Sequence, residues 1–245
     1  MKLINYLVYL FARAVLLWGR HAPMAPTFWF MRRLGLLAWR LARRRRALIL
    51  YNLEQALPEL PPEERERIGR ESFVNLLISV GECLHMDQMY ARHEDHFNFV
   101  GKENVQSLID RKKGFFVFGG HFGGWMLPGA IWKAFPDLPG ANMVARPLRN
   151  PKMQELLEYL AVNFGGRIIT TRGTGQQIVD AVAKGELVGL YMDQESRRDQ
   201  GVFVRFFGRE ASSHVVPGYL AWKHDIPLIP YWLIRERPGR FLVTL

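Results

Sequence analysis

The sequence predicts an α/β fold in which helices flank a mostly parallel central sheet, preceded by N-terminal amphipathic helices. From Phe97 onward, short apolar runs alternate with amphipathic stretches, as strands and helices do around a parallel sheet. Residues 1–46 mix apolar runs with arginine and aromatic residues, which is typical of segments at a membrane interface. The length of 245 residues suits one sizeable domain with attached helices.

The first segment, Leu3–Trp18, is almost entirely apolar and is interrupted only by Asn5 and Arg13. It is shorter than the roughly 20 residues that cross a bilayer. No small-residue cleavage site follows it, so we do not expect a removed signal peptide. A single membrane span by residues 3–18 stays open as the alternative to a helix that lies on the membrane surface.

A second predicted helix, Thr27–Leu41, carries several arginines among aromatic and apolar residues and leads into the run Arg43–Arg46. A basic amphipathic helix that ends in four arginines can lie among lipid headgroups, where each cation adds about 1 kcal/mol of attraction to anionic lipid. The alternative is an ordinary solvated helix end. We predict that residues 1–46 associate with a membrane and that residues 47–245 form the α/β domain.

The net charge of +10, from 33 Lys and Arg against 23 Asp and Glu, implies an anionic partner such as a bilayer surface, a nucleic acid or a phosphorylated substrate. A distinct basic block lies in the N-terminal segment, whereas a nucleic-acid-binding protein would carry its basic residues along the sheet domain. We therefore expect a membrane surface as partner and no nucleic acid.

Cysteine and histidine usage argues against a disulfide framework and against a metal site. The single cysteine, Cys83, lies in the apolar stretch Leu76–Leu84 and is predicted to be a buried, unreactive thiol. His85, His93 and His96 lack companions at metal-ligand spacing. We expect no metal.

The next predicted helix, Glu63–Met89, follows a Pro-Pro-Glu-Glu helix start. Its apolar residues recur every three or four positions, so one face is predicted to be buried. That face consists of Ile68, Phe73, Leu76, Leu77, Val80 and Leu84.

The predicted strands are Phe115–Phe118, Ala141–Arg146, Arg167–Thr170, Leu187–Met192 and Leu228–Ile234. The predicted helices between them are Pro151–Asn163, Thr174–Lys184 and Ala211–His224. Ser212, Ser213 and His214 resemble a nucleophile and base, but a helix N-cap explains them more simply. The sequence ends at Phe241–Leu245 in a predicted strand, which leaves open whether the natural protein continues.

The strongest candidate for chemistry is His121, which follows the predicted strand Phe115–Phe118 and has two glycines on each side. Open α/β sheets place their active sites at such strand ends. Glycines permit unusual backbone angles and close approach of a substrate or of the backbone. A neutral imidazole can accept a proton from a hydroxyl group. A capping or surface histidine is the alternative.

The segment Gly120–Trp125, with the sequence GHFGGW, resembles the signature of the lipid A biosynthesis acyltransferases, a branch of the lysophospholipid acyltransferase superfamily. Other family blocks match in the same order and cover nearly the whole chain. They are Asn52–Glu59, Arg146, Asp193-Gln194, Gly201–Val204, Phe206–Gly208 and Ile226–Pro230.

One position departs from the family pattern. The family places an Asp or Glu five residues after the histidine to orient the imidazole, and Met126 stands there. A thioether cannot stabilise an imidazolium ion. Three explanations stay open: an engineered inactivating change, a natural relative that is not an acyltransferase, or a carboxylate from elsewhere. Asp193, at the end of the strand Leu187–Met192, is the best candidate for that carboxylate. A turn or N-cap aspartate is the alternative.

The resemblance implies transfer of a fatty acyl group from an acyl carrier protein or acyl-CoA thioester to a hydroxyl of a lipid or glycolipid acceptor. His121 would be the general base, and N–H groups around Gly123–Trp125 would hold the oxyanion. No metal or organic cofactor is required. The residues expected to contact substrate are Gly123, Gly124, Trp125, Arg146, Arg149, Glu195 and Arg197. For Arg149 and Arg197, and for Arg198 next to Arg197, a solvated surface charge is the alternative.

The resemblance also implies a place on the cytoplasmic face of the bacterial inner membrane, held there as a peripheral or monotopic protein. The alternative function is a catalytically impaired, lipid-binding relative of the family, which the substitution at Met126 favours.

Overall fold

The computed structural model describes residues 2–170 and 173–245 and contains a central five-stranded sheet in the order β4-β3-β5-β2-β8. All of its strand pairs are parallel. The predicted α/β fold with a largely parallel sheet is therefore confirmed. The strands are β2 (Phe115–Gly119), β3 (Ala141–Ala145), β4 (Gly166–Thr170), β5 (Leu187–Tyr191) and β8 (Leu228–Pro230).

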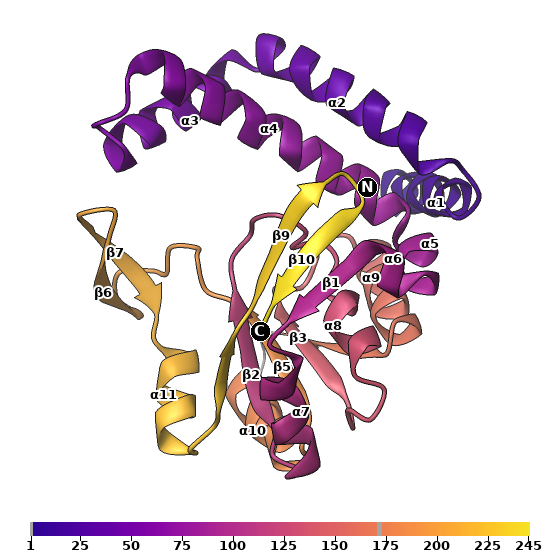
Figure 1. Ribbon diagram of the computed structural model, residues 1–245, viewed down its shortest axis with the longest axis vertical. Coiled ribbons are helices and arrows are strands. Elements are labelled where there is room, and N and C mark those ends of the chain that lie inside the picture. The colour runs from indigo at the N-terminus through magenta and orange to yellow at the C-terminus, as the bar shows by residue number, and fades with distance from the viewer. Residues whose placement is uncertain (1, 171–172) are drawn as a thin grey trace.

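Helices cover both faces of this sheet (Figure 1). Phe115 and Val117 of β2 belong to a core with residues of α7 and α8, while Phe116 between them packs with residues of α10 and α11. Strands that are buried on both faces form continuous apolar runs, which is why the sequence located β2 and β5 closely. The helices are α7 (Lys102–Asp110), α8 (Gly129–Ala134), α9 (Pro151–Asn163), α10 (Thr174–Ala183) and α11 (Val216–Lys223).

A second sheet has the order β1-β10-β9, and the sequence predicted it only in part. The single strand predicted for Leu228–Ile234 is wrong, because the chain leaves the first sheet at Pro230 and enters the second at Trp232. The buried Tyr231 lies at the crossing, where its amide donates to the Phe118 carbonyl at 2.8 Å. The strands are β1 (Phe97–Val100), β9 (Trp232–Arg237) and β10 (Arg240–Thr244).

The N-terminal part is helical and lies beside the second sheet (Figure 1). It consists of α1 (Lys2–Gly19), α2 (Met24–Leu41), α3 (Arg43–Ala56) and α4 (Pro62–Leu84), followed by α5 (Met86–Ala91) and α6 (His93–His96). Helices α2 and α4 pack closely, since a Cβ at Gly35 would lie 3.0 Å from the Val74 Cα. The helix predicted for Glu63–Met89 ends earlier, at Leu84, and the separate helix α5 begins at Met86.

The buried face of α4 also differs from the predicted one. Leu76 and Val80 are exposed, whereas Val74, Ile78 and Glu82 are buried. The small and polar residues Gly69, Ser79, Gly81 and Glu82 share the buried face with Val74 and Ile78. Glu82 is buried there because it has an ionic partner on β9. A pattern of apolar residues alone could not show such an interface.

The arginine run Arg43–Arg46 begins a helix and does not end one, since α2 stops at Leu41 and α3 starts at Arg43. Arg46 pairs with Glu66 of α4 at 2.9 Å. The predicted boundary at residue 46 thus falls within α3, and the division into two parts stays a prediction. Across the described residues, no helix is both long and apolar enough to cross a membrane.

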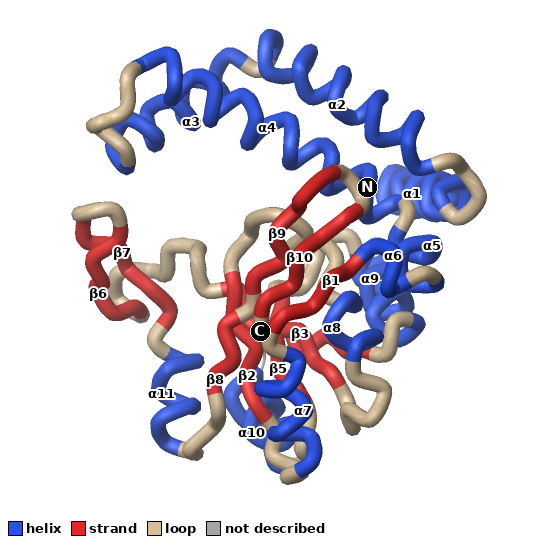
Figure 2. Tube along the Cα trace, viewed as in Figure 1, coloured by secondary structure: helices blue, strands red, loops and turns tan. Residues whose placement is uncertain are grey.

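An antiparallel hairpin of β6 (Gly201–Phe206) and β7 (Arg209–His214) stands apart from both sheets, as Figure 2 shows. The helix predicted for Ala211–His224 is wrong in its first part. Phe207 and Gly208 adopt positive φ values of 48° and 72° and turn the chain back, so Ser212, Ser213 and His214 lie in a strand and cap no helix. Only Val216–Lys223 is helical.

Candidate active site

The parallel pairing of β2 and β5 brings the two main candidate residues together. Gly119 at the end of β2 is in register with Tyr191 at the end of β5. His121 follows β2 by two residues, and Asp193 follows β5 by two residues. The carboxyl ends of adjacent parallel strands lie at one edge of the sheet, where open α/β folds bind their ligands.

His121 and Asp193 form two hydrogen bonds with each other. The ring Nδ1 of His121 lies 2.7 Å from Asp193 Oδ1, and the His121 backbone N–H donates to Asp193 Oδ2, also at 2.7 Å. A carboxylate only accepts, so Nδ1 carries the ring proton and Nε2 is the nitrogen left to accept one. The two side chains are 27% and 36% exposed, which leaves the pair accessible to a substrate.

Two opposing effects act on the pKa of Asp193. Its partial burial raises the pKa, while the hydrogen bonds and charge of His121 lower it and prevail, so the pKa lies below its usual value. The carboxylate is therefore ionised at neutral pH and can stabilise an imidazolium ion.

Two aromatic side chains hold the ring of His121 in place. The rings of Trp125 and Tyr191 lie 4.8 Å and 4.6 Å from it, centroid to centroid. The Tyr191 hydroxyl donates to the Trp125 carbonyl at 2.5 Å. Burial raises the pKa of Tyr191 far above its usual value, so the phenol keeps its proton. The sequence indicated Tyr191 only as a strand residue. Its position two residues before Asp193 is the signal that could have placed it beside the site.

The glycines after His121 permit a close approach of the loop to β9. Gly123 has a φ of 58°, and a Cβ there would overlap the Leu233 carbonyl oxygen. The Gly124 amide donates to that oxygen at 2.9 Å, and the Trp125 amide donates to Phe122 O at 3.2 Å. Among the three amides expected to hold an oxyanion, the Gly123 N–H alone makes no hydrogen bond within the described parts of the chain.

The other predicted site residues lie on the same edge of the sheet or in the segment after β5. Arg146 directly follows β3, the neighbour of β5. Arg146, Arg149 and Glu195 are exposed, and Arg197 pairs with Asp199 at 2.9 Å. Met126 is half-buried in the turn after Trp125.

A buried ion pair that the sequence did not reveal lies under the glycine loop. Arg235 of β9 contacts Glu82 of α4 through two hydrogen bonds of 2.8 and 2.6 Å, and both side chains are buried. In the sequence these residues look like ordinary surface charges on a helix and a strand. No local signal distinguishes them.

Cys83 is partly buried, and burial raises the pKa of its thiol to about 11. The thiol is therefore protonated at neutral pH, while its predicted lack of reactivity stays a prediction.

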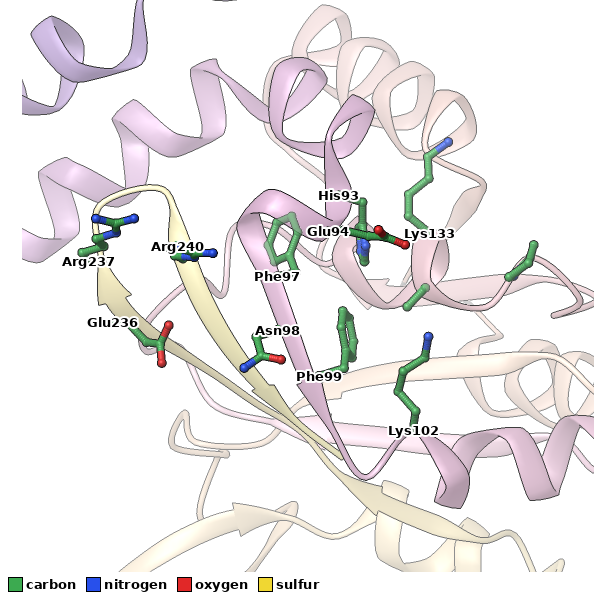
Figure 3. A pocket seen from close by; sticks show the side chains of 12 residues that line it. His93, Glu94, Phe97, Asn98, Phe99, Lys102, Lys133, Glu236, Arg237 and Arg240 are labelled. Carbon is green, nitrogen blue, oxygen red and sulfur yellow. The ribbon is translucent and has the colours of Figure 1, made fainter.

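A separate cavity of about 810 Å³ lies between α6, α8 and the second sheet (Figure 3). Its lining includes the cations Lys102, Lys133, Arg237 and Arg240. Neither His121 nor Asp193 lines it, so this cavity is distinct from the candidate active site.

Comparison with known proteins defines the class. Residues 1–244 match the family model of bacterial lipid A biosynthesis acyltransferases, and the chain belongs to this family.

Among its relatives is the lipid A biosynthesis acyltransferase of Haemophilus influenzae, 24% identical over 181 residues, which cover 72% of this chain and 55% of the relative. The lipid A biosynthesis palmitoleoyltransferase of Escherichia coli is 26% identical over 181 residues (73% and 57%). The lauroyltransferase of Escherichia coli is 26% identical over 212 residues (84% and 67%). The chain thus spans little more than half the length of the first two.

Proposed function

We propose that this chain transfers a fatty acyl group from an acyl carrier protein or CoA thioester to a hydroxyl of a lipid or glycolipid acceptor that resembles a lipid A precursor. The observation that carries the proposal is the 2.7 Å contact between His121 Nδ1 and Asp193 Oδ1. It supplies the histidine with a carboxylate although Met126 occupies the family's usual acidic position. Family membership and the names of the relatives support the reaction class.

In the proposed reaction, Nε2 of His121 takes the proton of the acceptor hydroxyl as its oxygen attacks the thioester carbonyl. Asp193 stabilises the imidazolium ion that forms. The Gly123 N–H donates to the oxyanion of the tetrahedral intermediate. When the intermediate collapses, the carbon–sulfur bond breaks and the imidazolium returns the proton to the leaving thiolate. The products are an ester and a free thiol, and this route requires no metal or organic cofactor.

Positively charged residues near the site suit an anionic substrate. Arg146 and Arg149 are exposed after β3 and form no ion pair within the described residues. We assign them to phosphate groups of the donor or the acceptor, which guanidinium groups bind with bidentate geometry. Glu195 and Arg197, in the segment after Asp193, contact the same substrates.

The N-terminal helices are the proposed membrane-binding surface. Leu3, Leu7 and Phe11 of α1 and Trp29 and Phe30 of α2 are exposed. Apolar and aromatic side chains of this kind insert among lipid headgroups, and the arginines nearby attract anionic lipid. We propose that this surface holds the protein on the cytoplasmic face of the bacterial inner membrane as a peripheral or monotopic protein.

Purified protein offered an acyl thioester and a hydroxyl-bearing lipid tests the function. We expect ester and free thiol to appear in equal amounts. Met126 favours a second candidate, a catalytically impaired relative that only binds lipid. That relative would bind the acceptor but release no thiol above the uncatalysed rate with either an acyl carrier protein or a CoA donor.

A further inference from the structure

The carbonyl oxygen of Gly123, two residues after His121, is held by two side chains from outside the loop. Arg235 Nη2 donates to it at 3.1 Å. The Ser79 hydroxyl lies 3.2 Å from it and 3.0 Å from the Asn75 carbonyl, so its single proton is shared between the two oxygens. Arg235 belongs to β9 and Ser79 to α4. Two elements far apart in the sequence therefore meet at one peptide group of the glycine loop.

The same peptide group is fixed at its other end. The Gly124 N–H donates to the Leu233 carbonyl of β9 at 2.9 Å. With both the oxygen and the N–H engaged, the plane of the Gly123–Gly124 peptide cannot rotate without losing hydrogen bonds. This plane sets the direction of the chain between His121 and Trp125, whose ring packs against His121.

Glu82 fixes the guanidinium group of Arg235. It receives two hydrogen bonds from Arg235 and a third, of 3.0 Å, from the Gly239 amide, and its side chain is 0% exposed. Arg235 Nη2 has two N–H groups: one donates to Glu82, and the other is shared between Ser79 Oγ at 2.6 Å and the Gly123 carbonyl at 3.1 Å. Burying two opposite charges is a weak source of stability, because desolvation offsets their attraction. What the pair supplies here is a fixed guanidinium next to the Gly123 carbonyl.

We propose that Arg235, Glu82 and Ser79 are positioning residues that hold the Gly123 peptide, and through it the His121 loop, in the geometry that acyl transfer requires. The inference rests on the function proposed above. None of the three residues touches the reacting atoms, and they act only through the loop.

Two conservative variants test the proposal while keeping the buried charge. Ser79→Ala removes the hydroxyl that accepts from Arg235 and shares its proton between the Gly123 and Asn75 carbonyls. Arg235→Lys keeps the cation next to Glu82 but cannot bind the carboxylate in a bidentate manner and also reach the carbonyl. Small displacements of reacting groups cost up to about a hundredfold in rate. We expect kcat to fall about tenfold in Ser79→Ala and about a hundredfold in Arg235→Lys, with an unchanged KM for the thioester.

The chain offers a matched control in Glu186. It is also a buried glutamate, and it pairs with Arg167 and accepts from Asn142 at 2.8 Å. It lies directly before β5, at the opposite end of the strands from His121. Glu186→Gln should lower the Tm and leave kcat unchanged when all proteins are assayed below their Tm. A wild-type kcat in folded Ser79→Ala and Arg235→Lys would overturn the proposal.

A second readout separates this proposal from the proposed function. In protein with ¹⁵N-labelled histidine, the Nδ1 proton of His121 bonded to Asp193 should give a low-field proton signal, assigned by its loss in His121→Ala. If the parent transfers no acyl group, the proposed function is contradicted. The proton signal then still tests whether Arg235, Glu82 and Ser79 hold the His121 loop in place. A signal displaced in Ser79→Ala and Arg235→Lys, but not in Glu186→Gln, supports the role. A signal unchanged in all three rejects it.

Discussion

Replacing Asp193 with asparagine should reverse the tautomer of His121. The two oxygens of Asp193 accept from the His121 amide and from the His121 ring, each at 2.7 Å. Asparagine has one acceptor oxygen and one NH₂ group. The backbone amide can only donate, so the asparagine oxygen should face it and the NH₂ group should face Nδ1. The ring proton then moves to Nε2, and the nitrogen that faces the acceptor hydroxyl can no longer accept a proton.

This change should cost nearly as much as losing the base altogether. General-base catalysis contributes roughly 10²–10⁴ in rate, which corresponds to about 3–5 kcal/mol of activation free energy. The assay is release of free thiol from one thioester donor at neutral pH. Asp225→Asn is the matched control, because Asp225 is almost fully exposed, pairs with Lys113, and has a positive φ of 49° that asparagine tolerates.

An Asp193→Asn protein that keeps most of its activity would refute this reasoning.

The pH dependence of the parent's stability should also reveal the ionised carboxylate of Asp193. Because the folded-state pKa of Asp193 is lowered, its contribution to stability is present above its unfolded pKa of about 4 and is lost as the pH falls through the lower, folded value. Asp193→Asn should remove this part of the acid dependence of unfolding.

Three further outcomes follow from the structure. Met126→Glu should change acyl transfer by less than about tenfold, because Asp193 already provides the counter-charge; restoration of an inactive parent would show that the family carboxylate was missing. Gly123→Ala should lower the Tm by several degrees, because backbone strain at this positive φ costs about 1–3 kcal/mol and the new Cβ would also overlap the Leu233 carbonyl. Gly175→Ala is the control and should leave the Tm unchanged, since Gly175 lies in open space on α10. Changing Leu7 and Phe11 to Glu should release the protein from anionic vesicles, because each buried side chain contributes about 1.5–3 kcal/mol, while salt should only weaken binding of the parent. Complete release of the parent by salt would contradict insertion.

The elements predicted most accurately from the sequence are those that a local residue pattern defines. β2 and β5 are buried on both faces, so each forms an apolar run bounded by turn residues, and their parallel pairing then places His121 next to Asp193. The hairpin of β6 and β7 depends instead on a turn at Phe207 and Gly208. The residues after that turn have an ambiguous pattern, so their strand was predicted as a helix.

Long-range contacts account for the parts of the site that the sequence missed. Glu82 and Arg235 lie 153 positions apart, and each alone has the pattern of a solvated charge. The buried face of α4 was mispredicted for the same reason, since Glu82 and small residues form part of it beside Val74 and Ile78.

The role of His121 as the base is tested by the rate of acyl transfer of His121→Ala. This rate is compared with that of the parent and of His224→Ala, a variant of an exposed histidine at the end of α11. We expect a loss of roughly 10²–10⁴ in kcat for His121→Ala, an unchanged rate for His224→Ala, and unimpaired folding and vesicle binding in both. A folded His121→Ala protein that transfers acyl groups at close to the parent rate would contradict the claim that His121 is the base.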